Sequence, residues 1–459
     1  MEHLMAVILA AGEGKRMKSA KSKVVHEICG KALIEWVARS VLKAGIEDRV
    51  FVVGHKAEQV KECLGENIQY ALQEVQLGTG HAVMQAERFL RGKEGQVVIL
   101  CGDMPLIRPE TIMKAVRLHR QSGNSATVIT ADLDNPAGYG RIVRDERGNV
   151  LKIVEHKDTN EEERNIREVN SGIYCFNIMD LLHSLKELGN SNSQGEYYLT
   201  DIMEIFVKKG LKVDAFKVED SSEILGINDR VQLAEAAQVL RKRILEEHMR
   251  SGVTLVDPGS TYIDGDVEIG MDTVIYPGTI LEGKTKIGEN CILGPNSRLV
   301  DCVIGNDTEV ANSVVIQSSV GSGTHIGPFA YIRPESSIGN KVKIGDFVEI
   351  KKSRIGDKTK ISHLTYVGDA EVGKNVNLGC GVVVVNYDGR NKYKTVVEDN
   401  AFVGCNVNLI SPVTVRSNAY IAAGSTIVGE VPENSLAIAR SKQEIKEGWV
   451  IKKGLRRKE

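Results

Sequence analysis

Residues 275–293 read IYPGTILEGKTKIGENCIL, and an aliphatic residue stands at every sixth position of this stretch. Ile275, Leu281, Ile287 and Leu293 mark the period. A period of six is neither that of an α-helix nor that of a flat strand, and it indicates a repeat whose aliphatic side chains share one narrow core. Gly and Asn, which ease tight turns, recur between the aliphatic positions. The stretch therefore predicts part of a parallel β-helix of hexapeptide repeats.

The same period extends from Ile263 to Ile427. We expect the core to be filled by the Ile, Val or Leu residues at 263, 269, 275, 281, 287, 293, 299, 304, 310, 316, 320, 326, 332, 338, 344, 350, 355, 361, 367, 372, 378, 384, 397, 403, 409, 415, 421 and 427. Steps of five or four indicate shortened turns, and the insertion VNYDGRNKYKTV at 385–396 is expected to project as a loop. Because such a coil buries only its own core, its flat faces favour packing against copies of the chain. Three-sided coils predict a homotrimer.

The first half of the chain alternates strand-like and helix-like segments. Strands are expected at MAVILAA (5–11), RVFVVG (49–54), GQVVILCGD (95–103), SATVITADL (125–133) and GIYCFNI (172–178), and helices at ALIEWVARSVLKAG (32–45) and GTGHAVMQAERFL (78–90). This order predicts a Rossmann-like α/β fold with a mostly parallel sheet. Ligands of such folds bind at the carboxyl ends of the strands, so we expect a site after Ala11 and at Asp103.

A helical pattern at about 229–252 separates the two halves, with Val231, Ala234, Val239, Ile244 and Leu245 as its apolar face. We therefore predict an α/β domain at 1–229, a linking helix at 230–251, and a β-helix domain with a C-terminal tail at 252–459.

Composition bounds the kind of protein. The 459 residues carry a net charge of −2, which gives no overall attraction to nucleic acid or to an acidic membrane. The basic end KKGLRRKE is expected to be a solvated tail or to touch an anionic ligand. Eight cysteines without metal-type spacing favour free thiols in a reducing cytoplasm. The apolar start LMAVILAAG is too short to span a bilayer, so no membrane insertion is expected.

Residues 18 apart should lie above one another on successive coils, because three hexapeptides make one coil. Arg333 and Lys351 are so related, and two stacked cations would bind a phosphate, although two solvated basic residues fit the spacing equally well. Cys405 and Ala423 share another such column, either beside a ligand or as small packing residues. His363 should point outward, as a site residue or a plain surface histidine.

Motifs along the whole chain carry a resemblance. They are LAAGEGKRM, LGTGHA, CGDMPL, GYGRI, IVEHKD, VNSGIY, GEYYLTD, GIND, YIRP, KKS, HLTYVGD, NYDG and AAGS. With them, the second half resembles the left-handed β-helix acyltransferases. The whole chain resembles the family of bifunctional N-acetylglucosamine-1-phosphate uridyltransferases and glucosamine-1-phosphate acetyltransferases.

For the first domain, the resemblance implies attack of a sugar 1-phosphate oxygen on the α-phosphate of UTP, with release of pyrophosphate. Arg16 and Lys23 would act on phosphate, and Asp103 with Asn228 would hold Mg²⁺. The resemblance implies that UDP-N-acetylglucosamine is bound by Leu9, Ala10, Ala11, Gly12, Lys23, Gln73, Gly78, Thr79, Gly140, Glu155, Asn170 and Asn228. By residue type alone, Gly12 and Gly14 suit close approach of backbone N–H groups to phosphate, while Asp103 could instead be a helix cap or turn residue.

For the β-helix, the resemblance implies that His363 is the general base that takes a proton from the amine of glucosamine 1-phosphate. The amine then attacks the thioester of acetyl-CoA. Imidazole suits this role at cytoplasmic pH. Glucosamine 1-phosphate would be bound by Arg333, Lys351, Tyr366 and Asn377, and acetyl-CoA by Cys380, Asn386, Tyr387, Cys405, Ala423 and Arg440, with Lys392 a further candidate for phosphate.

The chain departs from the family pattern at four positions. Ser22 stands where Pro often precedes the lysine, and Cys101 stands where an aromatic residue is common. Cys380 replaces Ala, and Cys405 replaces Ser. None of these changes removes a charge, but a thiol donates a weaker hydrogen bond than a hydroxyl, which bears on acetyl-CoA affinity.

The leading hypothesis is an enzyme that acetylates glucosamine 1-phosphate and then makes UDP-N-acetylglucosamine, a cell-wall precursor. Two alternatives remain at this point. One is a nucleotidyltransferase of single activity whose β-helix serves only oligomerisation. The other is a β-helix that scaffolds a protein partner.

Overall fold

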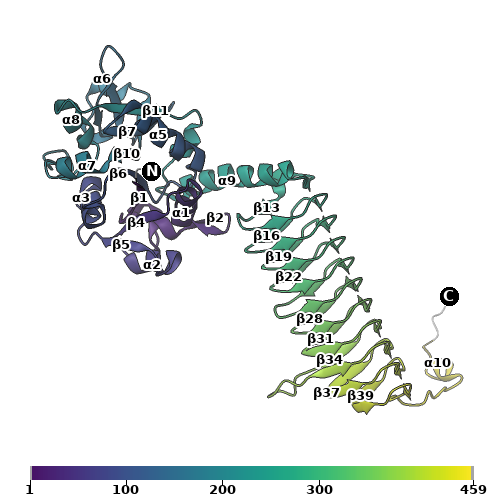
Figure 1. Cartoon of the computed structure of the whole chain (residues 1–459). Coiled ribbons are helices and arrows are strands. Elements are labelled where there is room, and N and C mark those ends of the chain that lie inside the picture. The colour runs from purple at the N-terminus through teal and green to yellow at the C-terminus, as the bar shows by residue number, and fades with distance from the viewer. Residues whose placement is uncertain (1–2, 456–459) are drawn as a thin grey trace. The chain divides into compact units, whose positions relative to one another are not determined.

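The computed structural model describes residues 3–455 of the chain, and the basic residues 456–459 of the predicted tail lie outside the described residues. The chain divides into two compact units, one up to Arg243 and one from Ile244 onward (Figure 1).

The first unit is built on one sheet of nine strands. The main path has the order β11-β7-β10-β6-β1-β4-β5, and β8 and β9 attach beside β10. The bounds are β1 (His3–Ala10), β4 (Asp48–Val53), β5 (Gln69–Leu72), β6 (Gly95–Cys101), β7 (Ala126–Asp132), β8 (Arg141–Arg144), β9 (Val150–Val154), β10 (Glu168–Asn177) and β11 (Val213–Lys217). β1 runs parallel to β4 and β6, whereas β10 is antiparallel to β6 and β7. The predicted mostly parallel α/β sheet is therefore confirmed.

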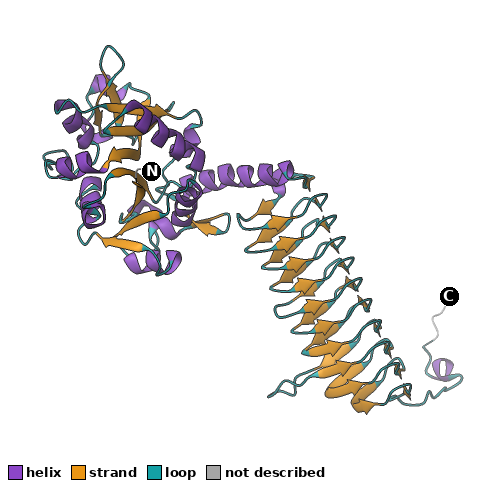
Figure 2. Ribbon diagram, viewed as in Figure 1, coloured by secondary structure: helices purple, strands orange, loops and turns teal. Residues whose placement is uncertain are grey.

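Helices and short elements surround this sheet (Figure 2). The helices are α1 (Leu33–Lys43), α2 (Ala57–Leu64), α3 (Thr79–Gln85), α4 (Glu87–Leu90), α5 (Pro109–Ser122), α6 (Glu161–Arg164), α7 (Ile178–Leu185) and α8 (Asp201–Lys208). The single helix expected at 78–90 is wrong, because the chain breaks at Ala86 into α3 and α4. A small hairpin joins β2 (Glu27–Ile28) to β3 (Lys31–Ala32).

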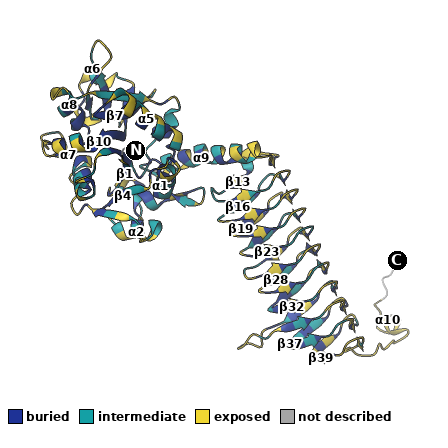
Figure 3. Ribbon diagram, viewed as in Figure 1, coloured by how far each residue is buried: buried dark blue, intermediate teal, exposed yellow. Residues whose placement is uncertain are grey.

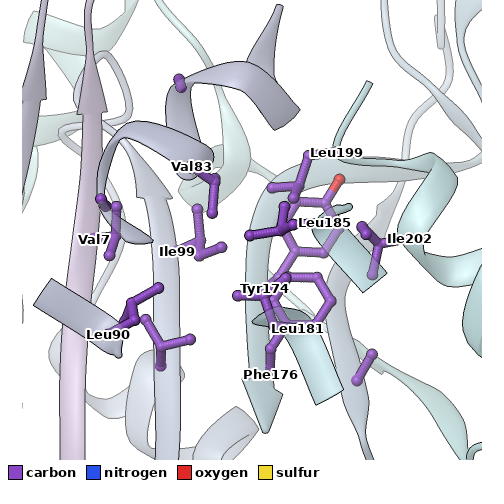
Figure 4. Packing of buried hydrophobic residues seen from close by; sticks show 14 of the residues in the cluster. Val7, Val83, Leu90, Ile99, Tyr174, Phe176, Leu181, Leu185, Leu199 and Ile202 are labelled. Atoms are coloured by element: carbon purple, nitrogen blue, oxygen red, sulfur yellow. The ribbon is translucent and has the colours of Figure 1, made fainter. Parts of the chain in front are cut away.

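Two hydrophobic clusters cover the two faces of the sheet. Met5 and Val7 of β1 belong to one cluster, and the alternate residues Ala6 and Ile8 belong to the other. Figure 4 shows the first cluster, where Tyr174 and Phe176 of β10 pack among leucine and isoleucine side chains. Successive strand residues point to opposite faces, so both faces of this sheet are buried, as a parallel sheet requires.

The predicted linking helix is α9 (Arg230–Arg250). Its buried residues are Ala236, Leu240, Ile244 and Leu245, whereas Val231 is 67% exposed. The expected apolar face was therefore right at Ile244 and Leu245 and wrong at Val231 and Ala234, which are exposed on the helix, while Val239 is partly buried. The division between units falls inside α9, after Arg243, so the predicted boundaries at 229 and 251 stay a prediction.

The second unit is a stack of coils with three short strands each, and all strand pairs are parallel (Figures 1 and 2). One sheet contains β12 (Thr254–Leu255), β15 (Val274–Ile275), β18 (Ile292–Leu293), β21 (Glu309–Val310), β24 (His325–Ile326), β27 (Lys343–Asp346), β30 (Lys360–His363), β33 (Asn377–Leu378), β36 (Phe402–Val403), β38 (Tyr420–Ile421) and β40 (Leu436–Ala437).

The other two sides of the coils form a sheet of 18 strands. They are β13 (Tyr262–Ile263), β14 (Glu268–Ile269), β16 (Ile280–Glu282), β17 (Lys286–Ile287), β19 (Arg298–Val300), β20 (Val303–Ile304), β22 (Val314–Ile316), β23 (Ser319–Val320), β25 (Tyr331–Ile332), β26 (Ser337–Ile338), β28 (Glu349–Lys351), β29 (Arg354–Ile355), β31 (Tyr366–Gly368), β32 (Ala370–Val372), β34 (Val383–Val385), β35 (Thr395–Val397), β37 (Asn408–Val415) and β39 (Thr426–Val431).

The hexapeptide prediction identified the core of this unit with two exceptions. All the expected positions are buried except Ile269 and Ile316, which are partly exposed (Figure 3). At the second of these, Val315 is fully buried and aligns with Leu299 and Ile332 on the neighbouring coils. The prediction of Ile316 is therefore wrong by one residue. The core positions Val310, Val315 and Val320 follow one another in two steps of five residues, whereas the sequence prediction had a step of six and then a step of four.

The projecting loop is shorter than predicted. Val385 ends β34, and Thr395 and Val396 already belong to β35, so 385–396 was too wide. Asn386 is buried, and Tyr387 and Lys392 form a bridge across the base of the loop.

A second buried column stands two residues before many of the aliphatic positions. It consists largely of Thr and Ser, whose hydroxyls donate to backbone carbonyl groups, as Thr273 does to Gly288 at 2.9 Å. Cys291 and Cys302 occupy the same position, and their thiols donate to the carbonyl groups of Gly305 and Val315. Small polar side chains therefore satisfy backbone groups at the corners of the coil.

The chain after β40 carries one short helix, α10 (Trp449–Lys452). Within residues 3–455, none of the helices combines the length and apolar character needed to cross a membrane.

The corrected core position can be tested. Val315→Ala should lower the free energy of unfolding of the β-helix by about 2 kcal/mol, because it removes buried methyl groups and leaves a cavity. Ile316→Ala, the matched control, should cost less although it removes more atoms. The measurement is the urea midpoint of the β-helix transition, and a larger shift for Ile316→Ala would reverse the assignment.

Candidate functional sites

A cavity of about 520 Å³ lies at the carboxyl ends of β1, β5 and β6. Its walls include nine of the residues predicted for the nucleotide and metal, namely Leu9, Ala10, Ala11, Gly12, Lys23, Gln73, Gly78, Thr79 and Asp103. Cys101 also lines it. The cavity therefore lies at the edge of the sheet where the sequence predicts a site.

Lys23 joins the two predicted metal ligands. Its ammonium group forms an ion pair with Asp103 and donates to the amide oxygen of Asn228 at 3.2 Å. Both partners of the ion pair are largely buried, with side chains 15% and 17% exposed. A carboxylate oxygen and an amide oxygen therefore converge on one cationic position.

Two glycines shape this cavity. Gly14 has φ +64°, and a Cβ there would lie 2.6 Å from Cβ of Lys23. Gly78 has φ +106°, and a Cβ there would lie 2.6 Å from the carbonyl oxygen of Tyr197. Both positions combine a left-handed backbone with close packing, so a side chain would displace Lys23 or the chain at Tyr197.

Gln73 and Thr79 are held by the cavity wall. Gln73 is buried, and its amide donates to the carbonyl group of Gly78 at 3.2 Å. The hydroxyl of Thr79 accepts from the backbone N–H of Leu199 at 3.1 Å.

Gly140, Glu155 and Asn170 lie outside the residues that line the cavity, but the structure brings two of them together. A Cβ on Gly140 would lie 3.5 Å from Cβ of Asn170, and the Asn170 N–H donates to the Gly140 carbonyl group at 2.9 Å. Glu155 accepts from the hydroxyl of Thr200 at 3.1 Å, and burial raises the pKa of Glu155.

Arg16 is not placed on the cavity wall. It lies exposed in the short helical turn Lys15–Met17, and its neighbours Glu13 and Lys15, which form an ion pair at 2.5 Å, line the cavity instead. The predicted role of Arg16 stays a prediction.

The two departures in the first unit have local explanations. The backbone N–H of Ser22 donates to the side chain of Gln59 at 2.7 Å, a bond that Pro could not make, and so the loop before Lys23 is fixed by another means. Burial raises the pKa of Cys101 to about 12, so its thiol is neutral at the cavity wall.

In the second unit, His363 belongs to β30 and lies at an exposed corner of the coil. Its Nδ1 atom is 2.5 Å from a carboxylate oxygen of Asp346, and the two residues are register partners on adjacent coils. The hydrogen bond to His363 lowers the pKa of Asp346. A carboxylate on Nδ1 leaves Nε2 of the ring for a second partner. Sequence reasoning missed Asp346, which stands 17 residues before His363 and not 18.

Arg333 and Lys351 stand on adjacent coils, as predicted, because Ile332 pairs in register with Ile350. Each cation has an acidic partner that the sequence prediction missed. Arg333 donates to Glu349 at 2.7 Å, and Lys351 donates to Asp369 at 3.2 Å. Asp369 stands 18 residues after Lys351, so the column spacing would have pointed to it, whereas Glu349 stands 16 residues after Arg333 and lies off that spacing.

Lys392, from the loop, lies against Lys351. Its pKa is lowered by the hydrogen bond to Lys351 and by the charge of that ammonium group. Two ammonium groups in contact repel each other, and an anion bound between them would relieve the repulsion. A cavity of about 410 Å³ adjoins this loop and is lined by Asp369, Lys392 and Tyr393 among others.

The remaining predicted sugar and acetyl-CoA residues divide between two faces. Tyr366 lies on β31, and a Cβ on Gly368 would be 2.4 Å from its hydroxyl oxygen. Asn386 is buried and donates to Asp369. Asn377 lies on β33, in the other sheet, and Tyr387 is exposed with its hydroxyl donating to Gly389.

Cys380, Cys405 and Ala423 follow His363 along one column. Ile361 pairs with Leu378, Leu378 with Val403, and Val403 with Ile421, and the column residues stand two positions after these. A Cβ on Gly424 would lie 4.0 Å from Cδ of Arg440, which places Arg440 beside the end of the column. The predicted acetyl-CoA contacts are thus mostly in line with the predicted base.

Among residues 3–455, no group of three or more His, Cys, Asp or Glu side chains is arranged to hold a metal ion. Asp103 and Asn228 supply only two oxygens. This donor set suits Mg²⁺, which commonly takes one or two protein ligands and completes its shell with phosphate and water.

These two sites define a class of protein, a nucleotidyltransferase unit joined to a hexapeptide-repeat transferase unit. Residues 5–224 match the family model described as nucleotidyl transferase. Residues 266–301 and 317–352 match the model described as bacterial transferase hexapeptide (six repeats).

Curated relatives match the whole chain. The chain is 71% identical over 459 residues to the bifunctional protein GlmU of Acetivibrio thermocellus, with 100% of both chains covered. It is 60% identical over 457 residues to the bifunctional protein GlmU of Caldanaerobacter subterraneus subsp. tengcongensis, with 99% of this chain and 100% of that one covered. The chain belongs to the family of bifunctional N-acetylglucosamine-1-phosphate uridyltransferases and glucosamine-1-phosphate acetyltransferases.

A solved structure of a putative glucose-1-phosphate thymidylyltransferase from Bacillus anthracis aligns with a TM-score of 0.42 at 20% identity, covering 51% of this chain and 94% of that one. The family, with both transferase units present, establishes a bifunctional enzyme of UDP-N-acetylglucosamine synthesis. The alternatives of a purely structural β-helix and of a partner scaffold are set aside.

Proposed function

We propose that uridylyl transfer takes place in the cavity of the first unit and acetyl transfer at the corner of the β-helix that carries His363. For uridylyl transfer, the supporting observation is the Lys23 ammonium held between Asp103 and Asn228. For acetyl transfer it is the Asp346–His363 pair, which stands in one column with the cysteines predicted to contact acetyl-CoA.

In the uridylyl site, the turn after β1 offers backbone N–H groups at Gly12 and Gly14, while Lys23 supplies a positive charge from the cavity wall. UTP bound there would present its α-phosphate to a phosphate oxygen of N-acetylglucosamine 1-phosphate, and pyrophosphate would leave in line. No covalent intermediate with the protein is needed, because positioning and charge neutralisation carry such transfers. Gly140, Glu155 and Asn170 would hold the sugar.

Asp103 and Asn228 would hold Mg²⁺. Their two oxygens already converge on a cationic group, so the arrangement fits a cation. When bound, the ion supplies neutralisation of phosphate charge. Lys23 would then turn from Asp103 toward the phosphates, which the flexible lysine stem permits.

The first-unit assignment predicts a selective loss. Asp103→Asn keeps the shape but removes the carboxylate charge, and it should lower the rate of uridylyl transfer about 100-fold or more. Acetyl transfer by the same variant should be unchanged, and a chelator should likewise stop only uridylyl transfer. Product formation from UTP and pre-acetylated sugar phosphate, followed by mass spectrometry, measures the effect.

Asp48→Asn is the matched control, because Asp48 begins β4 at the opposite edge of the sheet and pairs with Lys93 at 2.5 Å. Equal losses in the two variants would contradict a specific role for Asp103.

In the acetyl site, Asp346 holds Nδ1 of His363, so that Nε2 can accept a proton from the amine of glucosamine 1-phosphate. The amine nitrogen then attacks the thioester carbon of acetyl-CoA, and the CoA thiolate leaves. Asp346 is a positioning residue that fixes the tautomer and stabilises the imidazolium. Lys351, Lys392 and Arg333 would bind the sugar phosphate.

This mechanism predicts different effects at the two residues. His363→Ala should lower acetyl transfer about 100-fold or more, as expected for loss of a general base. Asp346→Asn should lower kcat roughly tenfold and shift the pH profile of kcat, while the KM for acetyl-CoA stays nearly constant. Uridylyl transfer should be unaffected in both variants.

His325→Ala is the matched control for His363→Ala. His325 is an exposed histidine of the same sheet, and its Nδ1 atom lies 3.0 Å from the carboxylate of Glu309. Acetyl transfer that survives in His363→Ala, or that falls equally in His325→Ala, would rule out the proposed base.

We also propose that the chain acts as a homotrimer in the cytoplasm. Eight free cysteines support a reducing compartment. The support for assembly is an exposed apolar corner formed by Phe329, Phe347 and Leu364 on three successive coils, each 57% or 58% exposed. These residues have φ of 60°, 55° and 46°, a left-handed backbone that costs a bulky residue roughly 1–2 kcal/mol.

The two phenylalanine rings of this corner stack at 5.4 Å. Bulky apolar side chains at strained, exposed positions are explained if another copy of the chain covers them. The corner lies directly beside the Asp346–His363 pair, so assembly would also enclose the acetyl site.

Phe347→Asp should therefore shift the mass measured by light scattering from three chains toward one, because it places a charge in the proposed interface. Val303→Asp is the control, since Val303 is 55% exposed but its register partners are the polar Lys286 and Ser319. An unchanged mass for Phe347→Asp would exclude this corner as the interface.

A further inference from the structure

The column that begins at Asp346 and His363 continues into two cysteines. Cys380 and Cys405 stand two residues after Leu378 and Val403, which are register partners on adjacent coils. The backbone N–H of Asn406 donates to the carbonyl group of Cys380 at 2.8 Å, which fixes the two turns against each other. Adjacent parallel strands are about 4.8 Å apart, and this lies within the range of about 4.4–6.8 Å between Cα atoms that a disulfide can bridge.

These two thiols are also accessible. Cys405 is exposed and Cys380 is partly exposed. Cys29, Cys63 and Cys101 are also partly exposed, but burial raises the pKa of Cys63 and of Cys101 to about 12, and it raises that of the buried Cys175 well above the ordinary range. Cys291 and Cys302 are buried and donate to carbonyl groups.

We propose that Cys380 and Cys405 form a dithiol modification site, which a hydroperoxide closes into an intrachain disulfide, and that closure stops acetyl transfer. The second part rests on the proposed role of His363. The site needs both departures from the family pattern, Cys at 380 in place of Ala and Cys at 405 in place of Ser, because a disulfide requires two thiols.

The chemistry balances with one hydroperoxide for each disulfide. The Cys405 thiolate attacks the terminal oxygen of the hydroperoxide, the O–O bond breaks, and an alcohol leaves with the proton. The Cys380 thiol then attacks the sulfenic sulfur of Cys405, and the S–O bond breaks to release water. The two thiols lose two electrons in total, and the hydroperoxide gains them. A small thiol reverses the reaction by exchange.

Disulfide formation affects the proposed acetyl site because the two turns that carry the cysteines are closely packed. A Cβ on Gly379 would lie 2.7 Å from the backbone nitrogen of Cys405, so the two turns are already in close contact. Bridging two sulfurs across this contact has to shift the turn at 379–381. That turn is joined to the base, since the N–H of Gly381 donates to the carbonyl group of His363 at 3.3 Å. The disulfide would also change the surface on which acetyl-CoA is proposed to lie.

The test uses the full chain. Purified protein is treated with hydrogen peroxide, desalted, and digested without reduction. Mass spectrometry should show a linked pair of peptides containing Cys380 and Cys405, two hydrogens lighter than the sum of the free peptides. Acetyl transfer should fall at least tenfold, uridylyl transfer should not change, and dithiothreitol should restore the loss.

Variants identify the thiols responsible. Cys380→Ala and Cys405→Ser should each keep the ratio of treated to untreated acetyl transfer near one, whatever the untreated rate of the variant. Cys29→Ala, which changes a partly exposed thiol of the first unit, should keep the sensitivity of the unmodified chain.

The absence of the linked peptides would overturn the site, and linked peptides without loss of acetyl transfer would overturn the effect on catalysis. These outcomes are separate from the failure of the proposed function. That failure is read from His363→Ala in untreated protein, and the peptide mapping does not depend on it.

Discussion

The constraint on which the second unit depends is the register between coils. Each coil must place an aliphatic side chain in a narrow core and must align its backbone hydrogen bonds with the coils above and below. Ile344, Ile361, Leu378 and Val403 satisfy both requirements. The residues that follow them are therefore stacked as well, and a column of outward side chains arises without any further specification. Asp346, His363, Cys380 and Cys405 form such a column, so the site is a consequence of how the core is packed.

The first unit brings distant residues together by a different means. Lys23, Asp103 and Asn228 are far apart in sequence, yet they meet because they follow elements that end at the same edge of the sheet. The sheet is buried on both faces, which fixes the strands, and the loops beyond their ends are free to carry polar groups. Gly14 packs so closely against Lys23 that position 14 has no room for a side chain.

The sequence predicted the architecture well because its two periodic patterns report packing directly. It identified nearly all the core positions, the edge of the sheet that holds the cavity, and the Arg333–Lys351 column. It failed where a turn changes length by one residue, as at Val315, since Ile316 is equally aliphatic. It also missed Asp346, Glu349 and Asp369, because their partners lie on another coil and the sequence offsets of 17, 16 and 18 residues differ from pair to pair. The exposure of Arg16 depends on the local path of the loop, which no pattern of residue types determines.

The two halves of the proposed acetyl site lie at opposite ends of one strand. His363 precedes β31 by three residues, and Lys351 pairs in register with Gly368 at its end. Tyr366 occupies the face between them. A single coil surface is flat and open to water there, and a general base works poorly unless its substrate is held and solvent is excluded. The apolar corner at Phe347 and Leu364 adjoins His363 on the side where a covering surface is needed. On the proposed function, catalysis at this site therefore depends on the proposed assembly as well as on register.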